Sequence, residues 1–206
     1  MKLILFTTMT ALLCFESPQA DSKPFKGKVH HIPGKIEAED YDEGAPGKAY
    51  YDVDTNNLGA NYRGVTQVDI EKRSDASNGY GIGWTRKGEW LNYSVDIKET
   101  GTYAIEIPVA SNKIGGLFVI EIKGKALCKP IHIPDTGGWD KLKLIKRTGL
   151  NLVKGRHVIR VVMLSEGESG SIGDIDYFNF TKISSSSEDI SRKQGTQVGE
   201  KLGREL

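Results

Sequence analysis

The sequence predicts an all-β protein, a β-sandwich of the jelly-roll type, from three observations. Between positions 29 and 183, apolar side chains recur at every second position in several short runs, a pattern typical of half-buried strands. Gly, Asn, Asp and Pro separate the runs, and many of the 24 glycines lie in these connections. The body of the chain contains no convincing amphipathic helix. Many short strands joined by glycine-rich turns favour a sandwich of antiparallel sheets.

The expected strands follow one another along the chain. A first run lies in IEAEDY, from Ile36, and a closing run lies in SIGDIDYFNF, from Ser171. Between them, four segments place alternate apolar residues on one strand face, as expected for a core-facing side. These residues are Leu91, Tyr93, Val95 and Ile97; Tyr103, Ile105, Ile107 and Val109; Phe118, Ile120 and Ile122; and Ile159, Val161 and Met163.

Residues 1–20 have the layout of a secretory signal peptide: one lysine, an apolar run from Leu3 to Phe15, then small and polar residues up to Ala20. The run is too short for a convincing membrane span. We therefore expect a secreted protein, and the bulky Leu13 disfavours the alternative of a lipid anchor on Cys14. The folded module is expected over 29–183, and residues 184–206 are expected to form a Ser-rich flexible tail or linker.

Charge and cysteine content narrow the class of partner. Lys and Arg total 28 against 27 Asp and Glu, a net charge of +1, and no long basic block occurs. Electrostatic binding of nucleic acid or of an anionic membrane therefore has no support, which favours a neutral partner. Once the signal is removed, Cys128 is the remaining cysteine, so we expect no disulfide framework and a small buried apolar side chain there.

Two acidic pairs lie in the otherwise apolar end strands. Glu37 and Glu39 are expected to share one strand face, and so are Asp174 and Asp176. If the first and last strands are neighbours, these carboxylates converge, and hard oxygen donors of this kind suit calcium. The alternative is two solvated strand faces. Because unpaired buried carboxylates are costly, a cation or strong hydrogen bonds must meet them if they are buried.

A catalytic role for these acids is disfavoured. Glycoside hydrolysis needs two carboxyl groups about 5 to 9.5 Å apart across an open cleft. Acids alternating with Ile, Ala and Phe are more typical of ligands for a structural ion. The four histidines show no metal-ligand spacing beyond an adjacent pair, and neither a Gly-x-Ser-x-Gly turn nor a Cys-His pairing occurs. We predict that the chain is not an enzyme.

Two tryptophans lie where an indole is easily exposed. Trp84 occurs in GYGIGWTRKGEW and Trp139 in DTGGWDKL, at strand ends or in glycine-rich loops. Exposed indole faces stack on the apolar face of a sugar ring, so the pair predicts a carbohydrate site. The alternative role is core filling, to which we assign Trp90 because it leads directly into a strand.

Seven stretches in order resemble a family 6 carbohydrate-binding module, across nearly all of 29–183. They are IEAEDYDEG; AYYDVDTNNLGANYR followed by VDIE; IGWTRKGEWLNYSVDI; GTYAIEIPVAS; IPDTGGWDKL; LVKGRHVIRVV; and GDIDYFNF. The resemblance implies a jelly-roll sandwich that binds polysaccharide and usually accompanies a glycoside hydrolase. The second stretch resembles a subgroup found with enzymes acting on agarose or β-1,3-glucans.

The resemblance also implies roles for individual residues. A structural calcium would be held by Glu37, Glu39, Asp176 and a backbone carbonyl near Arg63. The sugar would lie between Trp84 and Trp139. Asp174 takes the place of a residue that is commonly asparagine, and because a carboxylate accepts hydrogen bonds without donating, its hydroxyl contacts should differ. It could instead join the shell of the ion. Secondary sugar contacts are implied for Tyr51, Asn57, Asn61 and Tyr62, which could equally be turn and packing residues.

The sequence therefore predicts non-catalytic binding of a neutral polysaccharide, such as agarose or a β-1,3-glucan, by paired aromatic side chains in a loop-edge site, with a structural calcium. Two alternatives remain: a small secreted glycoside hydrolase, which would degrade the polysaccharide, or a surface adhesion module with a protein partner, which no glycan would retain.

Overall fold

The structure is a computed structural model that describes residues 22–183. Both the expected signal peptide, 1–20, and the expected tail, 184–206, lie outside the described residues. Among the described residues, no helix has the length and apolar character needed to cross a membrane. The helical structure within them is a single 3-10 turn, η1 (Phe25–Gly27).

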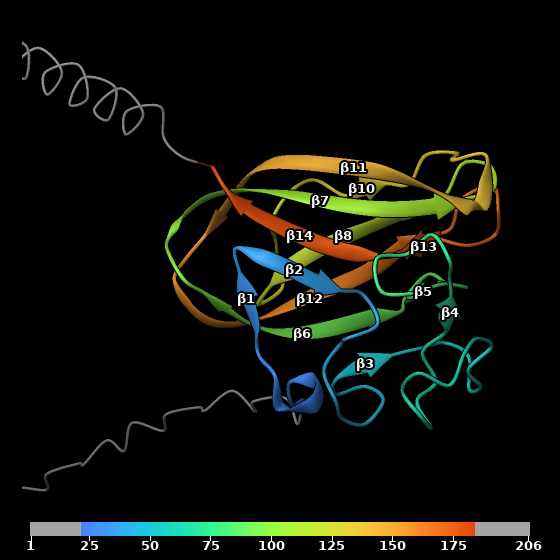
Figure 1. Cartoon of the computed structure of the whole chain (residues 1–206), viewed down its shortest axis with the longest axis horizontal. Coiled ribbons are helices and arrows are strands. Elements are labelled where there is room, and N and C mark those ends of the chain that lie inside the picture. Colours follow the sequence, from blue (N-terminus) through green and yellow to red (C-terminus); the bar gives the residue numbers. More distant parts are fainter. Residues whose placement is uncertain (1–21, 184–206) are drawn as a thin grey trace, which may run out of the picture.

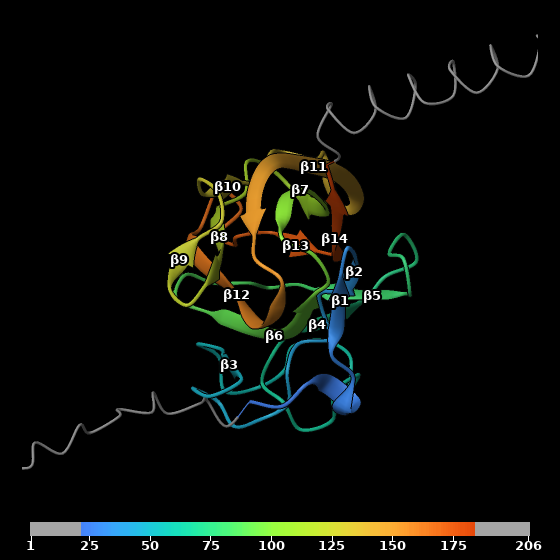
Figure 2. The same ribbon diagram turned by 90° about the vertical axis from the view of Figure 1, so that its left-hand side faces the viewer.

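Two seven-stranded sheets pack face to face (Figures 1 and 2), which confirms the predicted β-sandwich. The first sheet has the order β1-β6-β12-β8-β10, with β3 beside β6 and β9 beside β8. Its strands are β1 (His30–Ile32), β3 (Tyr50–Tyr51), β6 (Trp90–Ile97), β8 (Leu117–Ile122), β9 (Lys125–Ala126), β10 (Ile131–His132) and β12 (Gly155–Ser165).

The second sheet has the order β2-β14-β7-β13-β5-β4, with β11 along the other side of β7. Its strands are β2 (Gly34–Glu37), β4 (Ile70–Lys72), β5 (Tyr80–Ile82), β7 (Gly101–Ser111), β11 (Gly138–Leu152), β13 (Asp174–Ile175) and β14 (Tyr177–Lys182). Named strands of the described chain pair antiparallel, apart from β1, which runs parallel to β6.

The core lies between the sheets and contains the predicted alternating residues. Tyr93 on β6, Ile107 on β7 and Phe118 on β8 are each at most 1% exposed. Tyr93 packs edge-on against Phe178 with ring centroids 5.6 Å apart, and its hydroxyl donates to the Ala38 carbonyl at 2.7 Å. The buried phenol therefore has a packing partner for its ring and a hydrogen-bond acceptor for its hydroxyl group.

Two other residues of interest lie at the margin of this core. Cys128 is half-buried and packs against the core, close to the expectation of an apolar residue. Trp90, which we expected in the core, is half-buried beneath the guanidinium of Arg160, whose central carbon lies 3.9 Å from the ring.

The two end strands are neighbours, but both are shorter than expected. β2 pairs with β14, with Glu37 opposite Tyr177. However, β2 ends at Glu37, where the Asp40 N–H donates to the Glu37 carbonyl at 3.1 Å, so Glu39 lies in a turn and the two glutamates do not share a strand face. The closing strand likewise divides at Asp176, between β13 and β14.

The central position of β7 predicts a large effect of truncation there. We expect Ile107→Ala to lower the free energy of unfolding by about 2–5 kcal/mol, since Ile107 is 0% exposed and its removal leaves a cavity. The matched control is Leu144→Ala on the adjacent strand β11, where the side chain is 57% exposed and the loss should be much smaller. Urea unfolding of both variants measures the difference, and equal losses would contradict the packing described.

Candidate functional site

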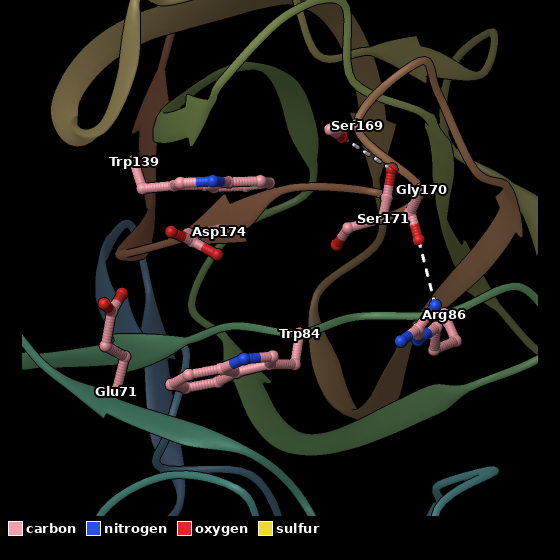
Figure 3. A pocket seen from close by; sticks show the side chains of 8 residues that line it. All are labelled: Glu71, Trp84, Arg86, Trp139, Ser169, Gly170, Ser171 and Asp174. Carbon is pink, nitrogen blue, oxygen red and sulfur yellow. Dashed lines mark hydrogen bonds between the residues drawn. The ribbon is translucent and has the colours of Figure 1, made fainter.

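A cavity of about 390 Å³ opens at one end of the sandwich, where β5, β11 and β13 meet (Figure 3). Glu71 comes from β4, Trp84 and Arg86 follow β5, and Trp139 lies at the start of β11. The floor is formed by Asp174 on β13. The full lining is Glu71, Trp84, Arg86, Trp139, Ser169, Gly170, Ser171 and Asp174.

Trp84 occupies one wall in an unusual backbone conformation. Its φ is 47°, in the left-handed region that bulky residues avoid, and its side chain is exposed at 40%. The preceding Gly83 lies close to the floor: a Cβ at this position would be 3.2 Å from Asp174 Oδ1. The chain therefore passes directly over the carboxyl group and then turns the indole outward, at a cost of about 1–3 kcal/mol that the surrounding structure must offset.

Trp139 forms the opposite wall, and the two indoles face each other across the cavity in Figure 3. It follows Gly137 and Gly138, whose φ values of 87° and 155° favour glycine. Pairing of β11 with β7 shifts between Gly138 and Lys143, so Trp139 lies in a stretch that leaves the regular ladder. This irregularity directs the indole into the cavity.

Arg73 links the floor of the cavity to the wall formed by Trp139. Its side chain is 3% exposed, and its Nη1 donates to Glu71 Oε2 and to Asp174 Oδ2, both at 2.7 Å. Nε and Nη2 bind the two carboxylate oxygens of Asp75 at 3.0 and 2.9 Å. Nη2 also donates to the Trp139 carbonyl at 2.6 Å. One buried guanidinium thus fixes the carboxylates and the backbone of one tryptophan.

The sequence-based reasoning missed Arg73, Glu71 and Arg86. A signal was present in IEKRSD, where an arginine lies between two acids, but nothing local shows that this arginine is buried. Burial raises the pKa of Asp174 to about 7, and the nearby Glu71 carboxylate adds to the effect while Arg73 opposes it. The cation that meets Asp174 is therefore an arginine of the chain itself.

The secondary residues lie outside the lining of this cavity. Asn57 closes a local turn, with Nδ2 donating to the Ala60 carbonyl at 3.1 Å. Asn61 is exposed. Tyr62 donates its hydroxyl to Asp40 at 2.9 Å and packs against another tyrosine. Tyr51, 43% exposed, lines a separate small cavity. The turn and packing roles are thus evident for Asn57 and Tyr62.

The carboxylates of the expected calcium site lie around the segment Ser77–Asn78. Ser77 donates its N–H to both Asp176 oxygens at 3.2 Å and its hydroxyl to Glu37 at 2.7 Å. Asn78 donates to Glu39 Oε1. Glu39 is fully buried, its Oε2 has no hydrogen-bond partner, and burial raises its pKa to about 7.

These groups fit a cation in part. An unpartnered buried carboxylate oxygen is the kind of atom that a metal ion satisfies, and the donors are hard oxygens. Two observations count against a cation. Lys35 Nζ lies 2.6 Å from Glu37 Oε1, so this carboxylate already has a positively charged partner. Within 22–183, no three His, Cys, Asp or Glu side chains are gathered closely enough to hold a metal. The Arg63 guanidinium donates to the carbonyls of Glu39 and Tyr41, which holds the turn that carries these acids.

Solved structures similar to this chain define its class. A module from Cellvibrio mixtus lichenase 5A, in complex with cellotriose, is 26% identical, with a TM-score of 0.54, over 74% of this chain and 98% of that one. The C-terminal module of the laminarinase LamC from Zobellia galactanivorans is 26% identical, with a TM-score of 0.51, over 72% and 98%. Both are carbohydrate-binding modules.

The family model for carbohydrate binding module family 6 matches residues 59–182, more than half of the chain. The chain belongs to this family, as its motifs indicated. Curated relatives include the clotting factor G alpha subunit of Tachypleus tridentatus, 27% identical over 59% of this chain, and the β-agarase AgaA of Microbulbifer thermotolerans, 32% identical over 42%. The matches cover 18% and 19% of those longer proteins.

The buried ion-pair network predicts a strong effect of removing its cation. We expect Arg73→Met to lower the free energy of unfolding by about 3–5 kcal/mol, because Asp174 is left buried without its partner. In the double variant with Asp174→Asn, part of this loss should return. Urea unfolding of the two single variants and the double variant measures the coupling. Strict additivity would contradict the network.

Proposed function

We propose that the module binds a neutral polysaccharide, such as agarose or a β-1,3-glucan, by holding a sugar ring between Trp84 and Trp139. The observation that carries this proposal is that both indoles line one cavity, with the Asp174 carboxyl group at its floor. Each indole covers one apolar face of the ring, and the carboxyl group accepts hydrogen bonds from hydroxyl groups.

The affinity of one such site should be modest. A short sugar has few apolar atoms, and its hydroxyl groups must leave water when it enters the cavity. Retention of a long polysaccharide can still be effective because neighbouring units rebind before the chain diffuses away. The structures of similar modules include one with bound cellotriose, which supports recognition of a glucan-like chain.

The proposal also covers where the protein acts, what it accompanies and why two other functions are disfavoured. The layout of residues 1–20 favours export, and the likeness to modules of a lichenase and a laminarinase favours association with a glycoside hydrolase. A protein partner at this site is disfavoured because the cavity is a narrow slot between two indoles. A hydrolytic role is disfavoured because Glu71 and Asp174 both bind the same Arg73 nitrogen.

The proposal includes a structural calcium held by Glu37, Glu39 and Asp176, with a backbone carbonyl near Arg63. The unpartnered Glu39 Oε2 supports it. A bound cation would neutralise the carboxylates and tie the turn after β2 to the junction of β13 and β14. Its contribution would be to stability and to the position of Asp176, two residues from the cavity floor.

Removal of either indole tests the sugar site. We expect Trp84→Ala and Trp139→Ala each to abolish retardation in affinity electrophoresis through agarose, laminarin, xylan or cellulose, because each variant loses one stacking face. Their unfolding temperatures should stay within a few degrees of the wild type. Trp90→Ala, outside the cavity, is the matched control and should keep binding. Undiminished retardation of both cavity variants would refute the proposed site.

Calcium dependence tests the ion site separately. Chelation should lower the unfolding temperature of the wild type, and added calcium should restore it by mass action. Glu39→Gln should weaken the response to calcium, while Glu106→Gln on β7, a surface residue paired with Lys146, should respond like the wild type. Differential scanning calorimetry at several calcium concentrations measures the shift, and a wild type indifferent to calcium would end this part of the proposal.

A further inference from the structure

The distribution of donors around Arg73 leaves the cavity floor short of positive charge. Its Nε and Nη2 are directed to Asp75, and Nη2 also binds the Trp139 carbonyl. Nη1 is the nitrogen shared by Glu71 and Asp174. One guanidinium therefore faces three carboxylates, so the group carries one surplus negative charge when Asp174 is protonated and two when Asp174 is ionised.

The two carboxylates that line the cavity each have an oxygen open to a ligand. Asp174 is 4% exposed, and its Oδ1 accepts no N–H or hydroxyl from any residue in the described part of the chain. The same is true of Glu71 Oε1. Both oxygens can therefore accept from a ligand in the cavity, and a positively charged donor that reaches both would form charge-assisted hydrogen bonds, which are stronger than those of a neutral donor.

The walls reinforce this preference. The faces of an indole carry negative electrostatic potential and attract cations, and two such faces enclose the cavity. The positive group of the lining, Arg86, lies on the far side of the slot from Glu71 and donates Nη1 to the Gly170 carbonyl at 3.1 Å (Figure 3). The slot is therefore negative at the Glu71 and Asp174 end.

We propose that the slot selects amino sugars, with the sugar ring between Trp84 and Trp139 and its primary ammonium group against Glu71 and Asp174. This inference rests on the proposed function and names the class of sugar that the same site prefers. A hydroxyl group supplies one donor and no charge, whereas an ammonium group supplies several donors and the missing positive charge. Acetylation of the nitrogen removes that charge, and a uronic acid would be repelled by the floor.

Four tetrasaccharides with the same β-1,4 linkage test the preference: glucosamine, N-acetylglucosamine, glucose and glucuronic acid oligomers. Titration calorimetry of the wild type at neutral pH should give at least a tenfold lower Kd for the glucosamine oligomer than for the glucose oligomer, about 1.4 kcal/mol. The ratio should shrink as salt is raised, because the selecting interaction is electrostatic.

Two variants locate the selecting charges. Glu71→Gln keeps the shape of a partly exposed side chain, and we expect it to reduce the glucosamine-to-glucose preference to about threefold or less, with Asp174→Asn acting in the same direction. The matched control is Asp140→Asn, which removes an exposed carboxylate beside Trp139 that does not line the cavity, and which should keep the wild-type ratio.

The outcomes separate the inference from the proposed function. Equal binding of glucosamine and glucose oligomers, or of glucosamine and its acetylated form, overturns the inference and leaves polysaccharide binding intact. Tighter binding of the glucuronic acid oligomer overturns it in favour of selection by Arg86. A preference that survives Glu71→Gln and Asp174→Asn also overturns it. If none of these oligomers binds and no polysaccharide retards the protein, the proposed function fails as well.

Discussion

The buried guanidinium of Arg73 is the centre of the interactions on which the cavity end of the sandwich depends. It joins β4, the connection after it, β13 and the start of β11 through short hydrogen bonds. An arginine suits this position because its planar fork can bind several oxygens at once and stays charged when buried. Without such a centre, the carboxylates would have to be neutral or solvated, and Trp139 would lose the anchor of its backbone.

The connection between β4 and β5 also links the cavity to the carboxylates around Ser77. Asp174 meets Arg73, and Asp176 meets Ser77, so both aspartates of the closing stretch contact the connection between β4 and β5. The break between β13 and β14 at Asp176 lets Asp176 turn toward that connection, while Ile175 stays in the core at 0% exposure. The contacts with the connection between β4 and β5 therefore give both buried aspartates hydrogen-bond partners, and they also help to hold the closing stretch in the second sheet.

Much of the fold could be predicted from the sequence because its strands are encoded by the local alternation of apolar and polar residues. Alternation in WLNYSVDI and YAIEIPVA predicted β6 and β7, and the glycines around Trp139 predicted an indole outside the core. The turn at Glu39 was missed because, besides the local bond from the Asp40 N–H to the Glu37 carbonyl, it is held by hydrogen bonds from Arg63 and Asn78, and the alternation of residues reveals none of these. Arg73 was missed because its burial depends on contacts with Asp174 and Trp139, which lie 101 and 66 positions away.

β14 carries the end of the described chain away from the cavity. Asp174 on β13 lies opposite Ala110 near the end of β7, whereas Lys182, the last residue of β14, lies opposite Tyr103 near its beginning. At about 3.3 Å per residue, these partners are separated along β7 by roughly 23 Å. In Figure 1, β14 ends at the opposite end of the sandwich from β13 and β5, the strands beside the cavity. A fusion partner joined after Ile183 would therefore begin at the end of the sandwich opposite the cavity and would leave the mouth of the cavity uncovered.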